Sequence, residues 1–137
     1  MPAIHGVRET ALYCDDLARC AAFYRKLLDR EPMLDTPRLV AFDAGHSTVL
    51  LLFQRGATTV PIEAAGGPVP GHHGLGPVHL AFGIEEADVE PWIARLGELG
   101  IAVESTVRWE RGGRSVYFRD LEGRSIELVT PRTWPSW

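Results

Sequence analysis

The sequence lacks the clusters of basic residues with which proteins bind nucleic acids and anionic membranes. Lys and Arg total 14 against 18 Asp and Glu, the formal net charge is −4, and no run of Lys or Arg occurs. Binding to a polyanion normally requires a basic face. The charge pattern therefore argues against a nucleic-acid or membrane partner.

Long hydrophobic runs and cysteine-rich patterns are also missing. No apolar stretch approaches the length of a transmembrane helix, and residues 1–6 have neither the charged beginning nor the apolar run of a signal peptide. The two cysteines, Cys14 and Cys20, do not form a CxxC pattern and offer no disulfide framework. These absences predict a cytoplasmic protein with two reduced thiols, buried or half-buried.

What is present is the composition of an ordinary globular protein. The chain has 137 residues, of which 45% are hydrophobic and 23% charged, and this length is sufficient for one domain with a buried core. The segment 58–77 holds five of the 14 glycines and four of the 10 prolines and has no periodicity. It is predicted to be a linker or an ordered loop.

The segments on the two sides of this loop repeat one order of elements. The first half is predicted to contain a strand, a helix capped by Asp15-Asp16 and further strands, in the order 7–14, 17–28, a short strand near 32–36, 38–44 and 47–54, with a turn at 44–46. The second half is predicted to contain a strand at 78–84, a helix capped by Asp88 and closed by Gly100 at its C-terminal end, and strands at 101–107, 114–119 and 125–130.

The two halves can be aligned as an internal repeat. Glu9 to Asp16 falls on His79 to Glu86, Val40-Ala-Phe on Val116-Tyr-Phe, and the six residues from Gly45 on the six from Gly123. A repeat of this kind predicts an α+β fold with two β-α-β-β-β modules. In each module a helix covers one face of a mostly antiparallel sheet, and the opposite faces form a shared cleft. The predicted boundaries within a single domain 1–137 are 5–56 for module one, 57–76 for the loop, 77–131 for module two and 132–137 for the tail.

Three predicted strands each place one ionisable side chain on the face away from the helices. Successive side chains of a strand point to opposite faces, so Glu9, His79 and Glu127 separate from the apolar residues that face the helices. Burying Glu127 in its apolar strand is costly unless its charge is neutralised. Two carboxylates and an imidazole are competent ligands for a divalent cation.

Each of these residues alone has a simpler interpretation. A single Glu on a strand usually faces solvent, and a single His among apolar neighbours is usually a hydrogen-bonded core residue. Two of the three, Glu9 and His79, occupy equivalent positions of the repeat, and all three share one parity. The joint pattern favours the metal site.

Three segments carry a family resemblance. They are Glu9-Thr-Ala-Leu-Tyr-Cys-Asp-Asp-Leu with the following Phe23-Tyr24, Gly76-Pro-Val-His-Leu-Ala-Phe, and Gly113-Arg-Ser-Val-Tyr-Phe-Arg-Asp-Leu-Glu-Gly-Arg-Ser-Ile-Glu-Leu. With them the chain resembles the vicinal oxygen chelate superfamily, which includes glyoxalase I, fosfomycin-resistance enzymes, bleomycin-resistance proteins and extradiol dioxygenases. Leu121 replaces the Pro that is usual in the family's last motif.

The resemblance implies a glyoxalase-like fold and one divalent metal ion, Mn, Fe, Ni, Co or Zn, with open positions where a substrate chelates through adjacent oxygens. His79 and Glu127 match ligand positions, whereas Glu9 stands where the family more often has His or Gln. The fourth ligand of glyoxalase I aligns with Val49, which counts against that activity. The resemblance further implies a homodimer in which each cleft is shared between subunits, so that the metal site is built within one subunit or between two.

The leading hypothesis is a metal-dependent lyase or isomerase, transferase or dioxygenase that activates a small-molecule substrate by Lewis-acid chemistry. Ser115 and Tyr117 match substrate-facing positions of the fosfomycin enzymes, although the cation-binding loop and C-terminal Arg of those enzymes have no obvious counterpart. Tyr117 is the predicted catalytic donor of a hydrogen bond or proton, with simple packing on the sheet as the other role open to it.

Two other functions stay open. One is a metal-free protein of the bleomycin-resistance type that binds a drug or another small molecule. The other is an extradiol dioxygenase, which usually has two His ligands, so that Glu9 counts against it. Four further residues are expected either at the cleft or as ordinary surface side chains: Tyr13, His72, His73 and Trp109.

Overall fold

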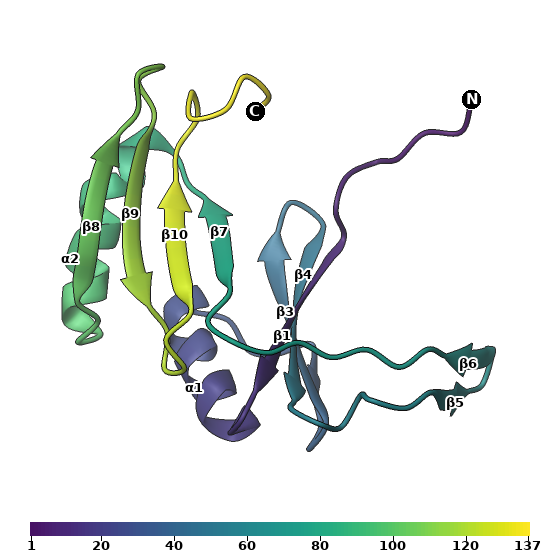
Figure 1. Cartoon of the computed structure of the whole chain (residues 1–137). Coiled ribbons are helices and arrows are strands. Elements are labelled where there is room, and N and C mark those ends of the chain that lie inside the picture. The colour runs from purple at the N-terminus through teal and green to yellow at the C-terminus, as the bar shows by residue number, and fades with distance from the viewer. The chain divides into compact units, whose positions relative to one another are not determined.

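The structure, a computed structural model, describes all 137 residues and contains two helices, one 3-10 turn and ten strands. The chain divides into two compact units, Met1–Leu75 and Gly76–Trp137. Each unit contains one helix and one four-stranded sheet (Figure 1), which confirms the predicted α+β fold with two β-α-β-β-β modules. No helix is both long enough and apolar enough to cross a membrane.

The first sheet has the strand order β1-β4-β3-β2. Its strands are β1 (Glu9–Cys14), β2 (Leu34–Asp35), β3 (Leu39–Gly45) and β4 (Thr48–Gln54). β1 pairs with β4 in parallel and the other pairs are antiparallel. Helix α1 (Leu17–Leu28) follows β1 and packs on β4, β3 and β1.

Helix α1 has the predicted bounds because two local signals agree. The side chain of Asp16 accepts a hydrogen bond from the backbone N–H of Arg19 at 3.1 Å, which caps the first turn. The buried side chains of the helix recur at helical spacing and form the face that packs on the sheet: Leu17, Cys20, Ala21, Tyr24 and Leu27.

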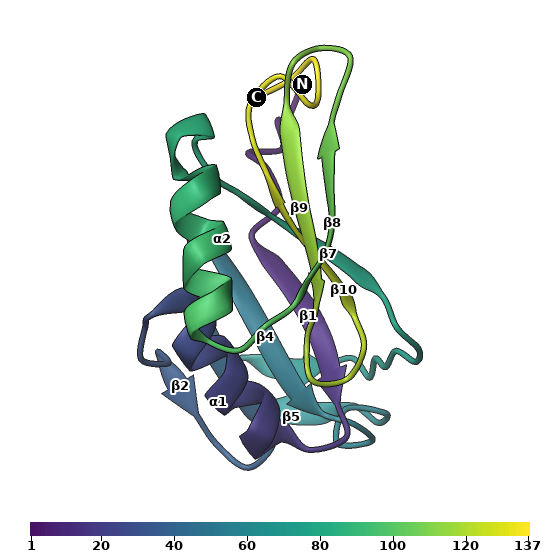
Figure 2. The same cartoon turned by 90° about the vertical axis from the view of Figure 1, so that its left-hand side faces the viewer.

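The second sheet repeats this topology in the order β7-β10-β9-β8. Its strands are β7 (His79–Gly83), β8 (Val103–Arg108), β9 (Arg114–Arg119) and β10 (Ser125–Val129), and β7 pairs with β10 in parallel. Helix α2 (Val89–Glu98) packs on β8 and β9, and Figure 2 shows it alongside these strands.

The two ends of α2 differ in how well the sequence predicted them. At the C-terminal end, Gly100 has a φ of +71° and its N–H reaches the carbonyl of Gly97, while the N–H of Ile101 reaches that of Leu96; this confirms the predicted glycine stop. At the N-terminal end Asp88 occupies the N-cap position, as predicted, but without a capping contact. A 3-10 turn, η1 (Glu86–Asp88), leads directly into the helix, and the Asp88 side chain accepts no capping hydrogen bond.

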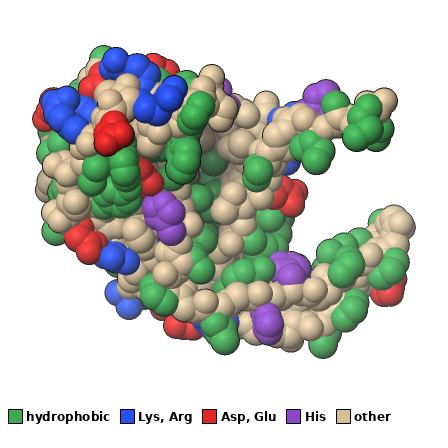
Figure 3. Space-filling model, turned by 45° about the horizontal axis from the view of Figure 1, so that its top comes forward, with side chains coloured by type: hydrophobic (Ala, Val, Ile, Leu, Met, Phe, Trp, Pro, Cys, Tyr) green, Lys and Arg blue, Asp and Glu red, His purple; other side chains and the backbone are tan.

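The glycine- and proline-rich segment contains a hairpin that the sequence did not predict. Strands β5 (Ile62–Ala64) and β6 (Gly67–Val69) pair antiparallel within it. In the space-filling view, hydrophobic side chains are scattered along the N-terminal segment and this hairpin (Figure 3). The exposed apolar residues there are Met1, Ile4, Val7, Val60, Ile62 and Val69.

Strand pairing refines the alignment of the two modules. Glu9 lies opposite Val49, and His79 lies opposite Ser125. If Glu9 and His79 are equivalent, as predicted, then Val49 is equivalent to Ser125. The counterpart of Glu127 is then Leu51. The alignment of Gly45 with Gly123, and of Val49 with a fourth ligand, is wrong by two residues. Phe42 pairs with Leu50 and Phe118 pairs with Ile126, so the two hairpins have the same length, and Gly123 lies two residues further along its hairpin than Gly45 does. Leu51 is also apolar, so module one still lacks a fourth carboxylate.

Candidate metal centre

His79 and Glu127 meet on the face of the second sheet that points away from α2. His79 begins β7 and Glu127 lies in the middle of the neighbouring β10, two residues beyond Ser125, the partner of His79. The flanking residues of Glu127, Ile126 and Leu128, are fully buried on the opposite face. His79 Nε2 and Glu127 Oε2 are 3.1 Å apart.

The second ring nitrogen of His79 determines the chemistry of this contact. Nδ1 lies 3.0 Å from the backbone carbonyl oxygen of Ser125. A carbonyl oxygen can only accept, so Nδ1 carries the hydrogen, and in the neutral ring Nε2 then presents a lone pair to Glu127. Two acceptors facing each other require a positive charge between them, either a proton on Nε2 or a metal ion. A His whose other N–H donates to a backbone carbonyl is the usual arrangement of a metal ligand.

The other carboxylate oxygen of Glu127 is held by a hydroxyl. Ser115 Oγ donates to Glu127 Oε1, and the indole Nε1 of Trp109 donates to Ser115 Oγ at 2.7 Å. Glu127 is 7% exposed and Ser115 1% exposed. A buried carboxylate is costly unless its oxygens are satisfied, and these contacts leave Oε2 directed at His79.

Tyr117 lies beside this pair. It is opposite Glu127 in the pairing of β9 with β10, and its ring centroid is 6.2 Å from that of His79. Burial, followed by the negative charge of Glu127, raises the pKa of the Tyr117 hydroxyl above its ordinary value of 10.0. The hydroxyl therefore keeps its proton at neutral pH and is available as a donor. Its catalytic role stays a prediction.

Glu9, the third predicted ligand, belongs to the first unit, whereas His79 and Glu127 belong to the second. Glu9 is exposed at the start of β1, on the parity opposite to the buried Leu12 and Cys14, as expected. The structure thus brings two of the three predicted ligands into contact. The participation of Glu9 stays a prediction.

Tyr13 and His72, two weaker candidates from the sequence, contact each other in the first unit. The Tyr13 hydroxyl and His72 Nδ1 are 2.6 Å apart, and the His72 ring meets Phe53 edge-on with 4.9 Å between centroids. Thr58 Oγ1 donates to the carbonyl of His72 at 2.5 Å. These contacts attach the segment after β6 to the sheet, whereas His73 is exposed.

The link from Trp109 to Glu127 is the feature that sequence reasoning missed. Trp109 was expected only as a border of the cleft or as a surface residue. Its connection to Ser115 depends on the tight turn between β8 and β9, in which the Trp109 N–H donates to the carbonyl of Gly113 at 2.8 Å. The Gly112-Gly113 pair was the available signal of such a turn.

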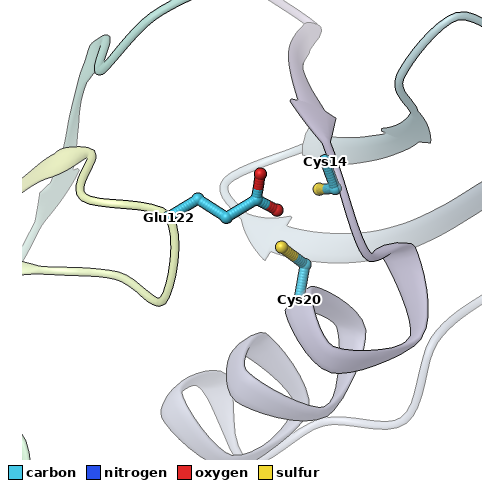
Figure 4. A group of neighbouring side chains, drawn as sticks. All are labelled: Cys14, Cys20 and Glu122. Carbon is cyan, nitrogen blue, oxygen red and sulfur yellow. The ribbon is translucent and has the colours of Figure 1, made fainter.

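The two cysteines form a separate pair in the first unit. Cys14 ends β1 and Cys20 lies in α1, both are buried, and their Sγ atoms are within 4.8 Å of each other (Figure 4). Neither forms a disulfide, as predicted. The figure also draws Glu122, which belongs to the second unit.

Comparisons with known proteins identify the family and the fold. A sequence model described as Glyoxalase/Bleomycin resistance protein/Dioxygenase superfamily matches residues 6–128. The crystal structure of lactoylglutathione lyase from Agrobacterium tumefaciens is 37% identical in sequence, with a TM-score of 0.86 over 98% of this chain and 99% of that one. Metallothiol transferase FosB of Staphylococcus haemolyticus is 25% identical over 93% of this chain and 84% of its own. Fosfomycin resistance protein FosX of Mesorhizobium japonicum is 40% identical over 53 residues, 38% of each chain.

Proposed function

Because this chain belongs to the Glyoxalase/Bleomycin resistance protein/Dioxygenase superfamily, we propose that it is a divalent-metal-dependent enzyme acting on a small substrate that chelates through adjacent oxygens. Relatives named as a lyase and a metallothiol transferase support an enzymatic function. The observation that carries the proposal is the contact of His79 Nε2 with Glu127 Oε2, two potential ligand atoms that lie 3.1 Å apart and can bind the same metal ion.

The ligands in this proposal are His79, Glu127 and Glu9. One imidazole nitrogen and two carboxylates suit Mn, Fe, Co, Ni and Zn. A metal ion bound there would act as a Lewis acid and stabilise negative charge that develops on a substrate oxygen. Ser115 keeps the Glu127 carboxylate in place, and the Ser125 carbonyl keeps the His79 ring in the tautomer that exposes Nε2.

Tyr117 is the proposed donor to the substrate. Its ring lies beside that of His79, and its raised pKa keeps the hydroxyl protonated at neutral pH. The hydroxyl can therefore donate a hydrogen bond, or pass its proton, to the substrate oxygen that gains charge.

The proposal includes a homodimer in which Glu9 of one copy completes the site that His79 and Glu127 form in the other. Glu9 and the pair belong to different units, so each copy supplies both parts of a site. Apolar side chains exposed along the N-terminal segment and the β5–β6 hairpin support association with a second copy, since burying them would remove apolar surface from water.

Metal analysis tests the function. Protein purified without chelators, and then titrated with Mn, Fe, Co, Ni and Zn, is expected to bind one ion per chain. Glu127→Gln should lose this binding, and Glu98→Gln, at the exposed end of α2, should retain it. Wild-type protein that takes up none of these metals overturns the proposal and favours a metal-free binding protein. Unchanged binding by Glu127→Gln would place the metal elsewhere.

A further inference from the structure

We infer that Trp109 is a positioning residue of the metal centre: its indole N–H, acting through Ser115, holds the Glu127 carboxylate in the orientation that binds the metal. The inference rests on the proposed function. Trp109 Nε1 lies 2.7 Å from Ser115 Oγ, and Ser115 Oγ contacts Glu127 Oε1, whose partner oxygen faces His79.

The chemistry of the three groups fixes the direction of the two hydrogen bonds that connect them. An indole nitrogen can only donate, so the Ser115 oxygen accepts from Trp109. A carboxylate can only accept, so the single hydroxyl hydrogen of Ser115 points to Glu127. Ser115 is 1% exposed, and no water reaches it as an alternative partner. Without the indole donor, the hydroxyl would lose one of the contacts that hold it in this rotamer.

The turn between β8 and β9 holds the indole in place. The backbone N–H of Gly112 donates to the carbonyl of Trp109 at 2.9 Å, and Gly112 has a φ of +98°, which favours glycine. A Cβ at Gly113 would lie 2.2 Å from Thr133 Oγ1, so the C-terminal tail packs directly on the turn. Trp109 is 40% exposed, yet its one polar atom points inward to Ser115.

The consequence for the metal follows from cooperativity. A hydroxyl that accepts a hydrogen bond becomes a stronger donor, so Trp109 strengthens the hold of Ser115 on Oε1 and leaves Oε2 for the metal. Removing a group that supports a metal ligand typically lowers the metal affinity by about 10- to 100-fold. We expect Ser115→Ala to fall within that range, and Trp109→Phe, which acts through one further bond, to weaken binding by up to about tenfold.

A double-mutant cycle tests the inference. Dissociation constants for Zn(II) and Mn(II) are measured by competition for wild type, Trp109→Phe, Ser115→Ala and the double variant. We expect the double variant to bind as weakly as Ser115→Ala, because the indole has no effect once the hydroxyl is gone. The matched control is Trp134→Phe in the exposed tail, which should bind like wild type. A Trp109→Phe effect that persists in the Ser115→Ala background, or that equals the control, overturns the inference.

A spectroscopic measurement gives a readout that a merely structural Trp would not produce. The chain has four Trp residues, so a ¹⁵N spectrum shows four indole resonances. That of Trp109 is identified by its loss in Trp109→Phe or, should that variant not fold, as the resonance that Ser115→Ala moves in the metal-free protein. Zn(II) should shift it in wild type and not in Ser115→Ala. Metal binding without this shift overturns only the inference, whereas wild-type protein that binds no metal overturns the proposed function as well.

Discussion

At the residue scale, the proposed metal site contains a contact that is unfavourable unless a proton or a metal ion lies between its two atoms. His79 Nε2 and Glu127 Oε2 are both acceptors when the imidazole is neutral and the carboxylate ionised. Burial prevents water from separating them freely, since Glu127 is nearly enclosed. Function and stability therefore make opposite demands on this one position, as is common at active sites.

Replacing Glu127 by Gln tests this opposition. The new amide oxygen can accept from Ser115 while its N–H donates to His79 Nε2, so both contacts become favourable. Metal-free Glu127→Gln should match or exceed wild type in free energy of unfolding, by up to about 1 kcal/mol. Urea unfolding with a chelator, at mildly alkaline pH, measures this. A loss of several kcal/mol would show instead that the carboxylate is needed for folding.

A second residue-scale prediction concerns the turn between β3 and β4. His46 and Ser47 both have positive φ, +47° and +61°, although neither is Gly. The left-handed conformation costs a non-glycine residue about 1–2 kcal/mol, and such two-residue turns favour glycine at the second position. Ser47→Gly should therefore raise the free energy of unfolding by about 1 kcal/mol, part of the relief being offset by glycine's chain entropy. Thermal unfolding is the measurement, with Ser105→Gly in extended β8 as a control that should destabilise.

The sequence predicted the faces of the site residues but not their hydrogen bonds. Parity alone placed His79 and Glu127 on one face, because the alternation of strand side chains does not depend on the rest of the fold. The role of Trp109 depends on a turn conformation and on the packing of Thr133 against Gly113, which lie 20 residues apart in sequence. No periodic pattern encodes such a contact.

At the element scale, the accuracy of prediction followed the number of independent local signals. Helix α1 was predicted to the residue because an aspartate cap and an apolar periodicity agree. The β5–β6 hairpin was missed because its strands have only three residues each and one contains Pro68, which normally argues against a strand. The two-residue error in aligning the modules arose from matching Gly45 with Gly123, because the turn glycine stands at a different position in each of the two hairpins.

The pairing of β8 with β9 includes an exposed ion pair with a defined pH dependence. Arg119 donates to both oxygens of Glu104, at 2.6 and 3.1 Å. The hydrogen bond from Arg119 lowers the pKa of the Glu104 carboxyl below its ordinary value of 4.5. A lowered folded-state pKa means that the pair contributes stability above pH 4.5, and that this contribution is lost as the pH falls through the folded-state pKa.

Glu104→Gln should accordingly be slightly less stable than wild type at neutral pH, by the small amount typical of exposed pairs. The difference should shrink as the pH falls below the ordinary carboxyl pKa, because wild type then loses the charged partner too. Urea unfolding of both proteins at neutral and at acid pH measures this. Glu98→Gln, at the exposed end of α2, is the control. A difference that is independent of pH would show that the side chain acts by packing rather than by charge.

At the scale of the whole molecule, the proposed ligands divide between the two units. His79 and Glu127 are in contact within the second unit, and Glu9 belongs to the first. A division of this kind allows two arrangements, a site built within one chain or a site shared by two. Variants in different units distinguish them, because only a shared site can be restored by mixing two defective chains.

Mixed dimers of Glu9→Gln and Glu127→Gln chains, isolated with two affinity tags, provide the test. If sites are shared, one of the two sites in each mixed dimer combines the intact Glu9 of one chain with the intact His79 and Glu127 of the other, and it should bind Zn(II) as tightly as wild type. If sites lie within single chains, every site retains one defect and none binds tightly.

The control is the mixed dimer of Glu127→Gln with His79→Gln, which cannot be restored in either arrangement because these two residues come from the same chain at every site. Titration of the mixed dimers counts the tight sites, and a wild-type chain that sediments as a monomer would refute the shared site at once.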